Sequence, residues 1–294
     1  MPNAYQGNSL GNSTWIWRPF FDTMRSANVL LTGLIALLLP SGPWGQDPGR
    51  VTVYLDGREQ SVRVWEPSAG APRRGVQVLV VSGDLGWLGV SATLPLHLRD
   101  QGYRVIGLNA QSYMAAFTDG RGSHLQETQI PRDFDTVMEA TNVDLRYPAH
   151  FVTVGISEGT GLAVVAMGQP GASDLCRGVI GLGFPMRTAL GWRWVDLLTE
   201  VSREEPPEQE TDTPRYLAGL RVPIVVIHSL HDEYDDISKV RAAFARAPEP
   251  KRFYPVDAPN HRFSHHGGEV MALVDSSIAW IESLARGASG DRAR

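Results

Sequence analysis

A serine, an aspartate and a histidine occur along this chain in an order that suits nucleophilic catalysis. Ser157 stands at the centre of residues 155–159, whose sequence GISEG fits the pattern G-x-S-x-G. Asp232 and His261 follow later, each shortly after a predicted strand. A serine hydroxyl is a weak nucleophile at neutral pH, so it needs a base, and the base needs a partner that fixes its tautomer. These residues therefore predict a nucleophile, an acid and a histidine base.

The residues around Ser157 predict a strand, a sharp turn and a helix. Residues 151–154 form a short, mainly β-branched apolar run, and residues 162–167 suit the buried face of a helix. On such a strained turn, a β-carbon at Gly155 or Gly159 would clash with nearby backbone. The start of a helix also favours negative charge beside the hydroxyl. The alternative interpretation is a glycine-rich turn that carries no chemistry.

Other acids lie close to the proposed acid. Glu233, Asp235 and Asp236 share its loop. Asp232 is preferred because it lies nearest to the end of the preceding strand, at the expected edge of the sheet.

Other histidines lie close to the proposed base. His265 and His266 are farther than His261 from the preceding strand, in a glycine-rich turn that we expect to face solvent. A zinc site built from these three and His231 is an alternative, but no H-E-x-x-H spacing is present. We therefore expect no metal and no cofactor.

The predicted mechanism also needs backbone amides that stabilise a negatively charged oxygen. One amide is expected from Glu158, directly after the serine. The second is expected from Asp84 or Leu85, in the loop SGDLGW at residues 82–87 after the first central strand. The glycines of this loop allow the backbone to approach a ligand closely.

The elements that must position these residues alternate between strand and helix. Largely apolar strands are predicted at 76–81, 103–108, 151–154, 178–182 and 222–228, with a further strand at 251–256. Besides the helix after Ser157, helices are predicted at 90–100, 132–145 and 268–285. Two alternating strands at 51–55 and 61–65 suggest a hairpin around Asp56-Gly57. This alternation predicts an α/β fold with a doubly wound, mostly parallel sheet, whose carboxyl edge would hold the site.

The regular pattern lapses at residues 184–221, before the strand that carries the acid. This segment includes an acidic, proline-bearing stretch at 202–214, so we predict a cap-like insertion, with a plain linker as the alternative. Aromatic residues could supply a wall that contacts substrate, although core packing is the alternative for each. The candidates are Trp87, Tyr113, Trp192 and Trp194.

Composition and charge argue against several classes of protein. The 294 residues are 43% hydrophobic and 20% charged, which is ordinary for one globular domain. The formal net charge is -5 and no basic run is present, so a nucleic-acid partner is not expected. Cys176 is the single cysteine, which excludes an internal disulfide and a cysteine-based zinc site.

The N-terminal segment predicts export. Residues 29–40 are almost continuously apolar, follow two arginines and precede small, turn-forming residues, which is typical of an export signal. A buried helix is the alternative. We expect a signal peptide or uncleaved anchor at 1–46, the catalytic domain at 47–285 and a disordered tail at 286–294. The expected location is periplasmic or secreted.

Several short stretches resemble hydrolases of the α/β-hydrolase fold over nearly the whole predicted domain. Those similar to the VirJ/AcvB group of exported bacterial hydrolases are SGDxGW at 82–87, GxN at 107–109 followed by Tyr113, GxSxG at 155–159 and GLG at 181–183. The loop NHRF at 260–263 is equally similar to dienelactone-hydrolase-like esterases. Two residues depart from the VirJ pattern: Leu85 replaces its usual glycine, and Glu158 its usual phenylalanine.

The resemblance implies a serine hydrolase of the bacterial envelope that cleaves a small-molecule or lipid carboxylic ester. Its VirJ-like part implies action on aminoacylated phospholipid head groups, or contact with a membrane surface or a secretion machine. Two alternatives stay open. One is a non-catalytic envelope binding component of a secretion assembly, and the other is a peptidase or acyltransferase that uses the same three residues.

Overall fold

The computed structural model describes residues 47–119, 123–142, 144–192 and 209–291. The predicted signal or anchor at 1–46 lies outside the described residues, as does the centre of the predicted insertion at 193–208, which contains Trp194. Within the described ranges, no helix combines the length and the hydropathy that crossing a membrane requires.

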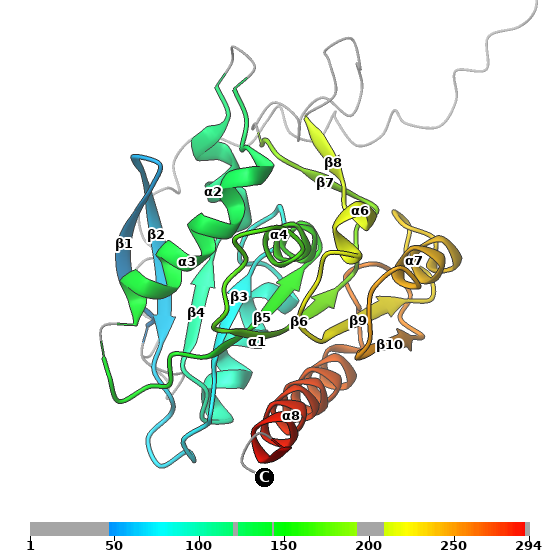
Figure 1. Ribbon diagram of the computed structural model, residues 1–294. Coiled ribbons are helices and arrows are strands. Elements are labelled where there is room, and N and C mark those ends of the chain that lie inside the picture. Colours follow the sequence, from blue (N-terminus) through cyan, green and yellow to red (C-terminus); the bar gives the residue numbers. More distant parts are fainter. Residues whose placement is uncertain (1–46, 120–122, 143, 193–208, 292–294) are drawn as a thin grey trace, which may run out of the picture. The chain divides into compact units, whose positions relative to one another are not determined.

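An eight-stranded sheet organises the described domain, with strand order β1-β2-β4-β3-β5-β6-β9-β10 (Figure 1). The strands from β4 to β10 in this order run parallel, and only β1 and β2 are antiparallel to their neighbours. The mostly parallel sheet that the sequence predicted is therefore confirmed. Its strands are β1 (Gly49–Leu55), β2 (Arg58–Trp65), β3 (Gln77–Val81), β4 (Val105–Leu108), β5 (Phe151–Ile156), β6 (Cys176–Leu182), β9 (Ile224–Ser229) and β10 (Lys251–Val256).

Helices cover both faces of this sheet. On one face, α1 (Val90–Asp100) and α8 (Gly267–Asp291) bury Leu94, Leu98 and Ile278 against apolar strand residues. The other face is covered by helices whose buried residues join a second apolar cluster. These are α2 (Ala110–Phe117), α3 (Ile130–Thr141), α4 (Glu158–Met167) and α7 (Ile237–Phe244). The short 3-10 helix η1 (Glu127–Gln129) leads into α3. The arrangement is doubly wound, as predicted.

The turn between β1 and β2 follows from its two residues. Leu55 pairs with Arg58, so Asp56 and Gly57 alone form the connection. Both have positive φ, 46° and 76°, which is the conformation of a type I′ turn and suits the twist of antiparallel strands. The pair Asp-Gly thus produces the hairpin.

Helices α2 and α7 were not predicted from the sequence. Helix α2 begins after Asn109, whose side chain accepts a hydrogen bond from the Ser112 amide. Helix α7 begins after Asp236, whose carboxylate accepts from the amides of Ser238 and Lys239. Each has eight residues, fewer than the 11 or more over which helical periodicity becomes visible. Their capping residues were the available signal.

The two ends of the predicted insertion have structure of their own. Strands β7 (Arg187–Ala189) and β8 (Glu210–Asp212) pair antiparallel, and α6 (Pro214–Leu217) follows them. The C-terminus differs from the prediction, because α8 continues through Asp291 whereas a disordered tail was expected from residue 286. Extending an existing helix costs far less than starting one, which explains how the glycines of this stretch are accommodated.

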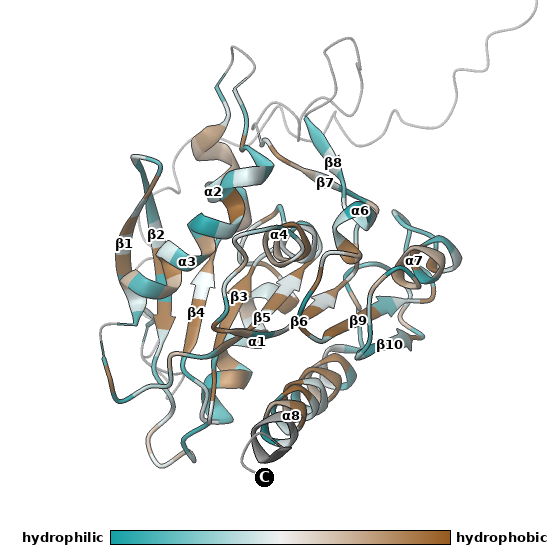
Figure 2. Cartoon of the chain, in the orientation of Figure 1, coloured by the Kyte–Doolittle hydropathy of each residue, from teal (hydrophilic) through white to brown (hydrophobic). Residues whose placement is uncertain are grey.

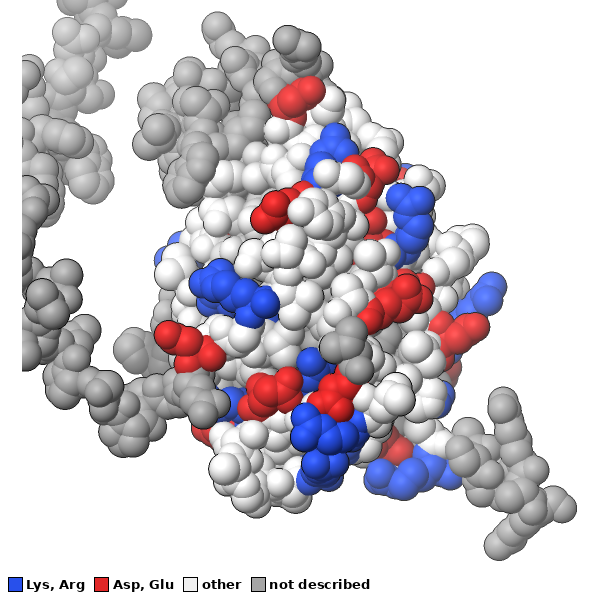
Figure 3. Space-filling model, turned by 90° about the vertical axis from the view of Figure 1, so that its left-hand side faces the viewer, with Lys and Arg blue, Asp and Glu red and all other residues white. Residues whose placement is uncertain are grey.

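Hydropathy follows the layers of the fold. Figure 2 shows hydrophobic residues along β3, β4 and β9, and hydrophilic residues along β10. All of β3 is buried, whereas β10, at the edge of the sheet, is largely half-buried or exposed. On the face seen in Figure 3, acidic and basic residues are interspersed and do not form one extended patch of a single sign.

Candidate active site

Ser157 lies on a sharp turn between β5 and α4, where its backbone has φ 53° and ψ −120°. This region is unfavourable for a residue with a side chain and is held only by the surrounding structure. A β-carbon on Gly155 would lie 2.4 Å from the Gly159 oxygen, and one on Gly159 would lie 2.2 Å from the Val81 oxygen. The predicted steric reason for both glycines is therefore confirmed.

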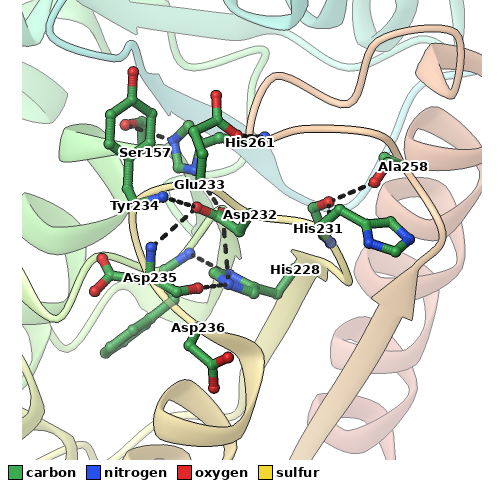
Figure 4. Close-up of polar contacts among 12 residues, drawn as sticks. Ser157, His228, His231, Asp232, Glu233, Tyr234, Asp235, Asp236, Ala258 and His261 are labelled. Atoms are coloured by element: carbon green, nitrogen blue, oxygen red, sulfur yellow. Dashed lines mark hydrogen bonds and ion pairs between the residues drawn. The ribbon is translucent and has the colours of Figure 1, made fainter.

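The three side chains predicted from the sequence meet at the carboxyl edge of the sheet (Figure 4). His261 Nε2 lies 2.9 Å from Ser157 Oγ, and His261 Nδ1 lies 2.6 Å from Asp232 Oδ2. A carboxylate only accepts, so Nδ1 carries the proton and Nε2 is free to accept the serine proton. The arrangement can therefore pass a proton from the serine hydroxyl to an imidazole that a carboxylate supports.

The side chain of Asp232 has no exposed surface but is well supplied with hydrogen bonds. Its Oδ1 accepts from the amides of Tyr234 (3.0 Å) and Asp235 (3.1 Å). Burial, the largest influence, acts to raise the pKa of Asp232, but the hydrogen bond and charge of His261 together with these amides lower it. The carboxylate is thus held in its charged form, which can stabilise a protonated His261.

The other acids of this loop have different partners. Glu233 Oε2 accepts from the main-chain N–H of His261 at 2.7 Å, and Asp235 Oδ2 accepts from the Met186 amide at 3.0 Å. Asp236 caps α7. Of the four acids, only Asp232 places a carboxylate oxygen at the imidazole nitrogen, and it is the acid that the sequence favoured for its place near the strand end.

The loop after β3 lies beside the serine. A β-carbon on Gly83 would be 3.5 Å from the β-carbon of Ser157. The amides of Asp84 and Leu85 donate no hydrogen bond to any residue that the structure describes. Glu158 is the first residue of α4 and directly follows the serine, so its amide lies at the start of the helix. The carboxylate of Glu158 accepts from the Ala189 amide at 3.0 Å, which ties the turn to β7. The loop and the helix start can therefore supply the predicted pair of donors.

Tyr113 is not available to a substrate, which corrects its prediction as a contact. Its side chain is completely buried, and its hydroxyl donates to Asp133 Oδ2 at 2.7 Å. Burial raises the pKa of both groups, and the charge of Asp133 adds to the shift at Tyr113. Tyr113 therefore joins α2 to α3 inside the core.

The two described tryptophan candidates also belong to the packing. The Trp87 ring meets Trp65 edge-on at 5.4 Å, and both rings lie over Gly107. Trp192 is buried in the cluster on the α4 side of the sheet. Core packing, the alternative given for each, is what the structure supports.

Two neighbours of His261 were not identified as site residues from the sequence. The Tyr234 ring meets the imidazole edge-on at a centroid distance of 5.1 Å and is 67% exposed (Figure 4). Gly183, directly after β6, has φ +66°, and a β-carbon there would lie 2.6 Å from His261 Cε1. In the sequence, Gly183 was noted only as part of the GLG stretch at 181–183 that resembles the VirJ/AcvB group. No sequence pattern pointed to Tyr234.

The remaining histidines near the site do not converge. His231 pairs with Asp257 and His266 with Glu269, each at 2.9 Å. His265 is exposed. Across the part of the chain that the structure describes, no group of three His, Cys, Asp or Glu side chains could hold a metal ion.

No protein-family model matches this chain, and no curated protein matches it. Solved structures do. Est1E from Butyrivibrio proteoclasticus with ferulic acid bound is 13% identical, with 79% of this chain and 99% of that chain covered and a TM-score of 0.59. Dienelactone hydrolase from Anabaena variabilis is 18% identical, with coverages of 79% and 97% and a TM-score of 0.53.

A third structure, XC6422 from Xanthomonas campestris, is described as an α/β serine hydrolase without a lid. It is 16% identical, with coverages of 80% and 95% and a TM-score of 0.52. Similarity at such identities concerns the fold. The chain has the α/β-hydrolase fold, as the sequence predicted, and its narrower resemblance to the VirJ/AcvB group stays a prediction.

Proposed function

We propose that this protein is a serine hydrolase that cleaves carboxylic esters. The observation that carries the proposal is the pair of hydrogen bonds at His261, 2.9 Å to Ser157 Oγ and 2.6 Å to Asp232 Oδ2. Fold does not imply function, so these side chains, and not the similar solved structures, support the proposed activity. The strained backbone at Ser157 supports it, because such strain persists where the surroundings enforce it and concentrates at functional sites.

The first half of the reaction forms an ester on the protein. Ser157 Oγ attacks the carbonyl carbon of the substrate while its proton moves to His261 Nε2, and Asp232 stabilises the resulting imidazolium. The amides of Glu158 and of Asp84 or Leu85 stabilise the negatively charged oxygen of the tetrahedral intermediate. His261 then returns the proton to the leaving alkoxide, and the alcohol departs.

The second half releases the acid. His261 Nε2 takes a proton from water, and the hydroxide attacks the carbonyl of the acyl group on Ser157. The same amides stabilise the second intermediate. The proton returns to Ser157 Oγ as the bond breaks, which leaves a carboxylic acid and the original site. The exposed Tyr234 ring beside His261 is assigned to the wall that the substrate contacts.

The proposed substrate is a small-molecule or lipid ester. The solved Est1E complex contains ferulic acid, an aromatic carboxylic acid, which supports an ester of comparable size. We further assign the protein to the bacterial envelope because of the apolar segment at 29–40. Fusing residues 1–46 to an alkaline phosphatase that is active only after export tests this location. Absence of phosphatase activity would contradict it.

The enzymatic proposal is tested with Ser157→Ala. We expect the turnover of short p-nitrophenyl esters to fall by about 10,000-fold or more, with the melting temperature nearly unchanged. Ser276→Ala, which alters an exposed serine of α8, is the matched control and should retain full activity. Undiminished hydrolysis by Ser157→Ala would remove the mechanism.

A fluorophosphonate probe separates the remaining alternatives. The proposal expects labelling that maps to Ser157, whereas a non-catalytic binding component would not be labelled. Ester, amide and lipid substrates, with and without an added alcohol as acyl acceptor, then distinguish an esterase from a peptidase and an acyltransferase. Hydrolysis of amides in preference to esters would contradict the assigned substrate class.

A further inference from the structure

A second histidine lies fully buried next to the acid of the site. His228 is in β9, near its carboxyl end, and its side chain has no exposed surface. The proposed mechanism does not use it. A buried polar ring needs hydrogen-bond partners at both nitrogens, and His228 has them (Figure 4).

The partners of His228 determine its tautomer. Nδ1 lies 3.2 Å from the amide nitrogen of Phe184, and Nε2 lies 2.9 Å from the carbonyl oxygen of Asp235. An amide N–H can only donate and a carbonyl can only accept. The ring is therefore neutral, with its proton on Nε2. The same nitrogen lies 3.5 Å from Asp232 Oδ2, a second and longer contact.

On one side, His228 holds the turn that carries the acid. Its hydrogen bond to the Asp235 carbonyl closes the loop from residue 228 to residue 235. The amide of Asp235 donates in turn to Asp232 Oδ1 at 3.1 Å. Because Oδ1 is held in this way, Oδ2 is left to face His261.

On the other side, His228 holds the backbone against which the base rests. Phe184, which donates to His228 Nδ1, directly follows Gly183. Gly183 lies so close to the His261 ring that an added β-carbon would be 2.6 Å from Cε1. A shift of this peptide would therefore displace the imidazole.

We propose that His228 is a positioning residue, which fixes both the Asp232 carboxylate and the Gly183 backbone so that His261 stays aligned with Ser157. The inference rests on the proposed function, because alignment matters only if His261 transfers protons. His228 touches neither the substrate nor the reacting atoms. It acts through the Phe184 amide, the Asp235 carbonyl and Asp232.

Two substitutions separate the two ring nitrogens. In His228→Asn, the side-chain oxygen can still accept from Phe184, but the donor toward Asp235 and Asp232 is lost. In His228→Gln, an N–H donor is retained at the position of Nε2. We expect kcat to fall about 10- to 100-fold in His228→Asn and only a few-fold in His228→Gln, with KM within about twofold of the wild type. If His228 had only a structural role, kcat would not differ between the two variants in this way while KM stayed nearly constant.

His231→Asn is the matched control. His231 lies three residues farther along the same segment, but its side chain is 62% exposed and pairs with Asp257 at the surface. This variant should keep the wild-type kcat and KM. If His228→Asn behaves in the same way, or if KM rises while kcat stays constant, the proposal is overturned.

A measurement on the wild-type chain reports the tautomer of His228 directly. Long-range ¹H–¹⁵N correlation spectra distinguish the histidine tautomers, and the His228 signal is assigned by its absence in His228→Gln. We expect the neutral form protonated on Nε2 at pH 7, and a proton on Nδ1 would overturn the proposal. The two hypotheses can fail separately. A wild type that neither reacts with fluorophosphonate nor hydrolyses esters refutes the proposed function, whereas an active wild type with a fully active His228→Asn refutes the role of His228 alone.

Discussion

The turn around Ser157 and the pair formed by Asp232 and His261 are built in different ways. The turn is one contiguous stretch, and backbone atoms hold it: β-carbons on Gly155 or Gly159 would come within 2.4 Å of main-chain atoms. The acid and the base are 29 positions apart, lie on separate loops, and are joined by side-chain hydrogen bonds.

This difference determines how each part should respond to substitution. The backbone atoms of the turn are closely packed and leave no space for a β-carbon. An added methyl group must therefore displace neighbouring main-chain atoms. A hydrogen-bonded pair can lose one bond and keep its fold, because the removed interaction is local. The turn should therefore couple activity to stability, and the acid–histidine pair should let the two be changed separately.

Asp232→Asn should have the largest effect and break the pair without unfolding the chain. The amide can still accept at one oxygen, but its NH₂ group favours the wrong tautomer of His261. We expect kcat for p-nitrophenyl esters to fall about 10,000-fold, with circular dichroism unchanged. Activity within tenfold of the wild type would show that Asp232 is not the partner of the base.

Gly159→Ala should break the turn. Its β-carbon would meet the Val81 oxygen at 2.2 Å, so we expect the free energy of unfolding, measured in urea, to fall by roughly 3 kcal/mol and the activity to fall with it. Gly268→Ala is the control, because nothing lies within 4 Å of its added β-carbon and stability should change by less than about 1 kcal/mol. Equal stabilities of the two variants would contradict the steric account.

The pH dependence of the free energy of unfolding should reveal the contribution of the Asp232 carboxylate. The pKa of Asp232 is lower in the folded than in the unfolded state, so the unfolded chain takes up its proton first as the pH falls. The resulting stabilisation is complete above about pH 4 and is lost as the pH falls through the folded-state pKa. Urea unfolding at a series of acidic pH values should therefore show a steeper loss for the wild type than for Asp232→Asn. Parallel curves would contradict the pKa shift.

Glu233→Ala should have the smallest effect. Glu233 is exposed and accepts a hydrogen bond from the main-chain N–H of His261. Removing its carboxylate therefore makes the position of His261 less well fixed but removes no reacting group. We expect kcat/KM to fall about two- to fivefold, since exposed interactions of this kind contribute about 1 kcal/mol or less. Glu233→Gln retains an acceptor oxygen and should remain near the wild type. A loss as large as that of Asp232→Asn would make Glu233 the acid.

The sequence predicted most of what depends on local pattern. The order of strands and helices, the Asp56-Gly57 turn and the glycines around Ser157 all follow from residue types at short spacing. Helices α2 and α7 were missed because eight residues are too few to show a period. Trp87 and Tyr113 were assigned to the substrate wall because an aromatic residue has the same appearance in a sequence whether it packs inside or faces a ligand.

The sequence by itself determined the fold class and the candidate residues Ser157, Asp232 and His261, because a strained turn and the ends of successive parallel strands are defined by neighbours in the chain. Only the tertiary structure decided which carboxylate faces His261, that Gly183 lies behind its ring, and that His228 joins the two loops. These contacts connect His228 of β9 with residues in the loops after β6, β9 and β10. Distances between separate strands depend on register and packing, which no local pattern records.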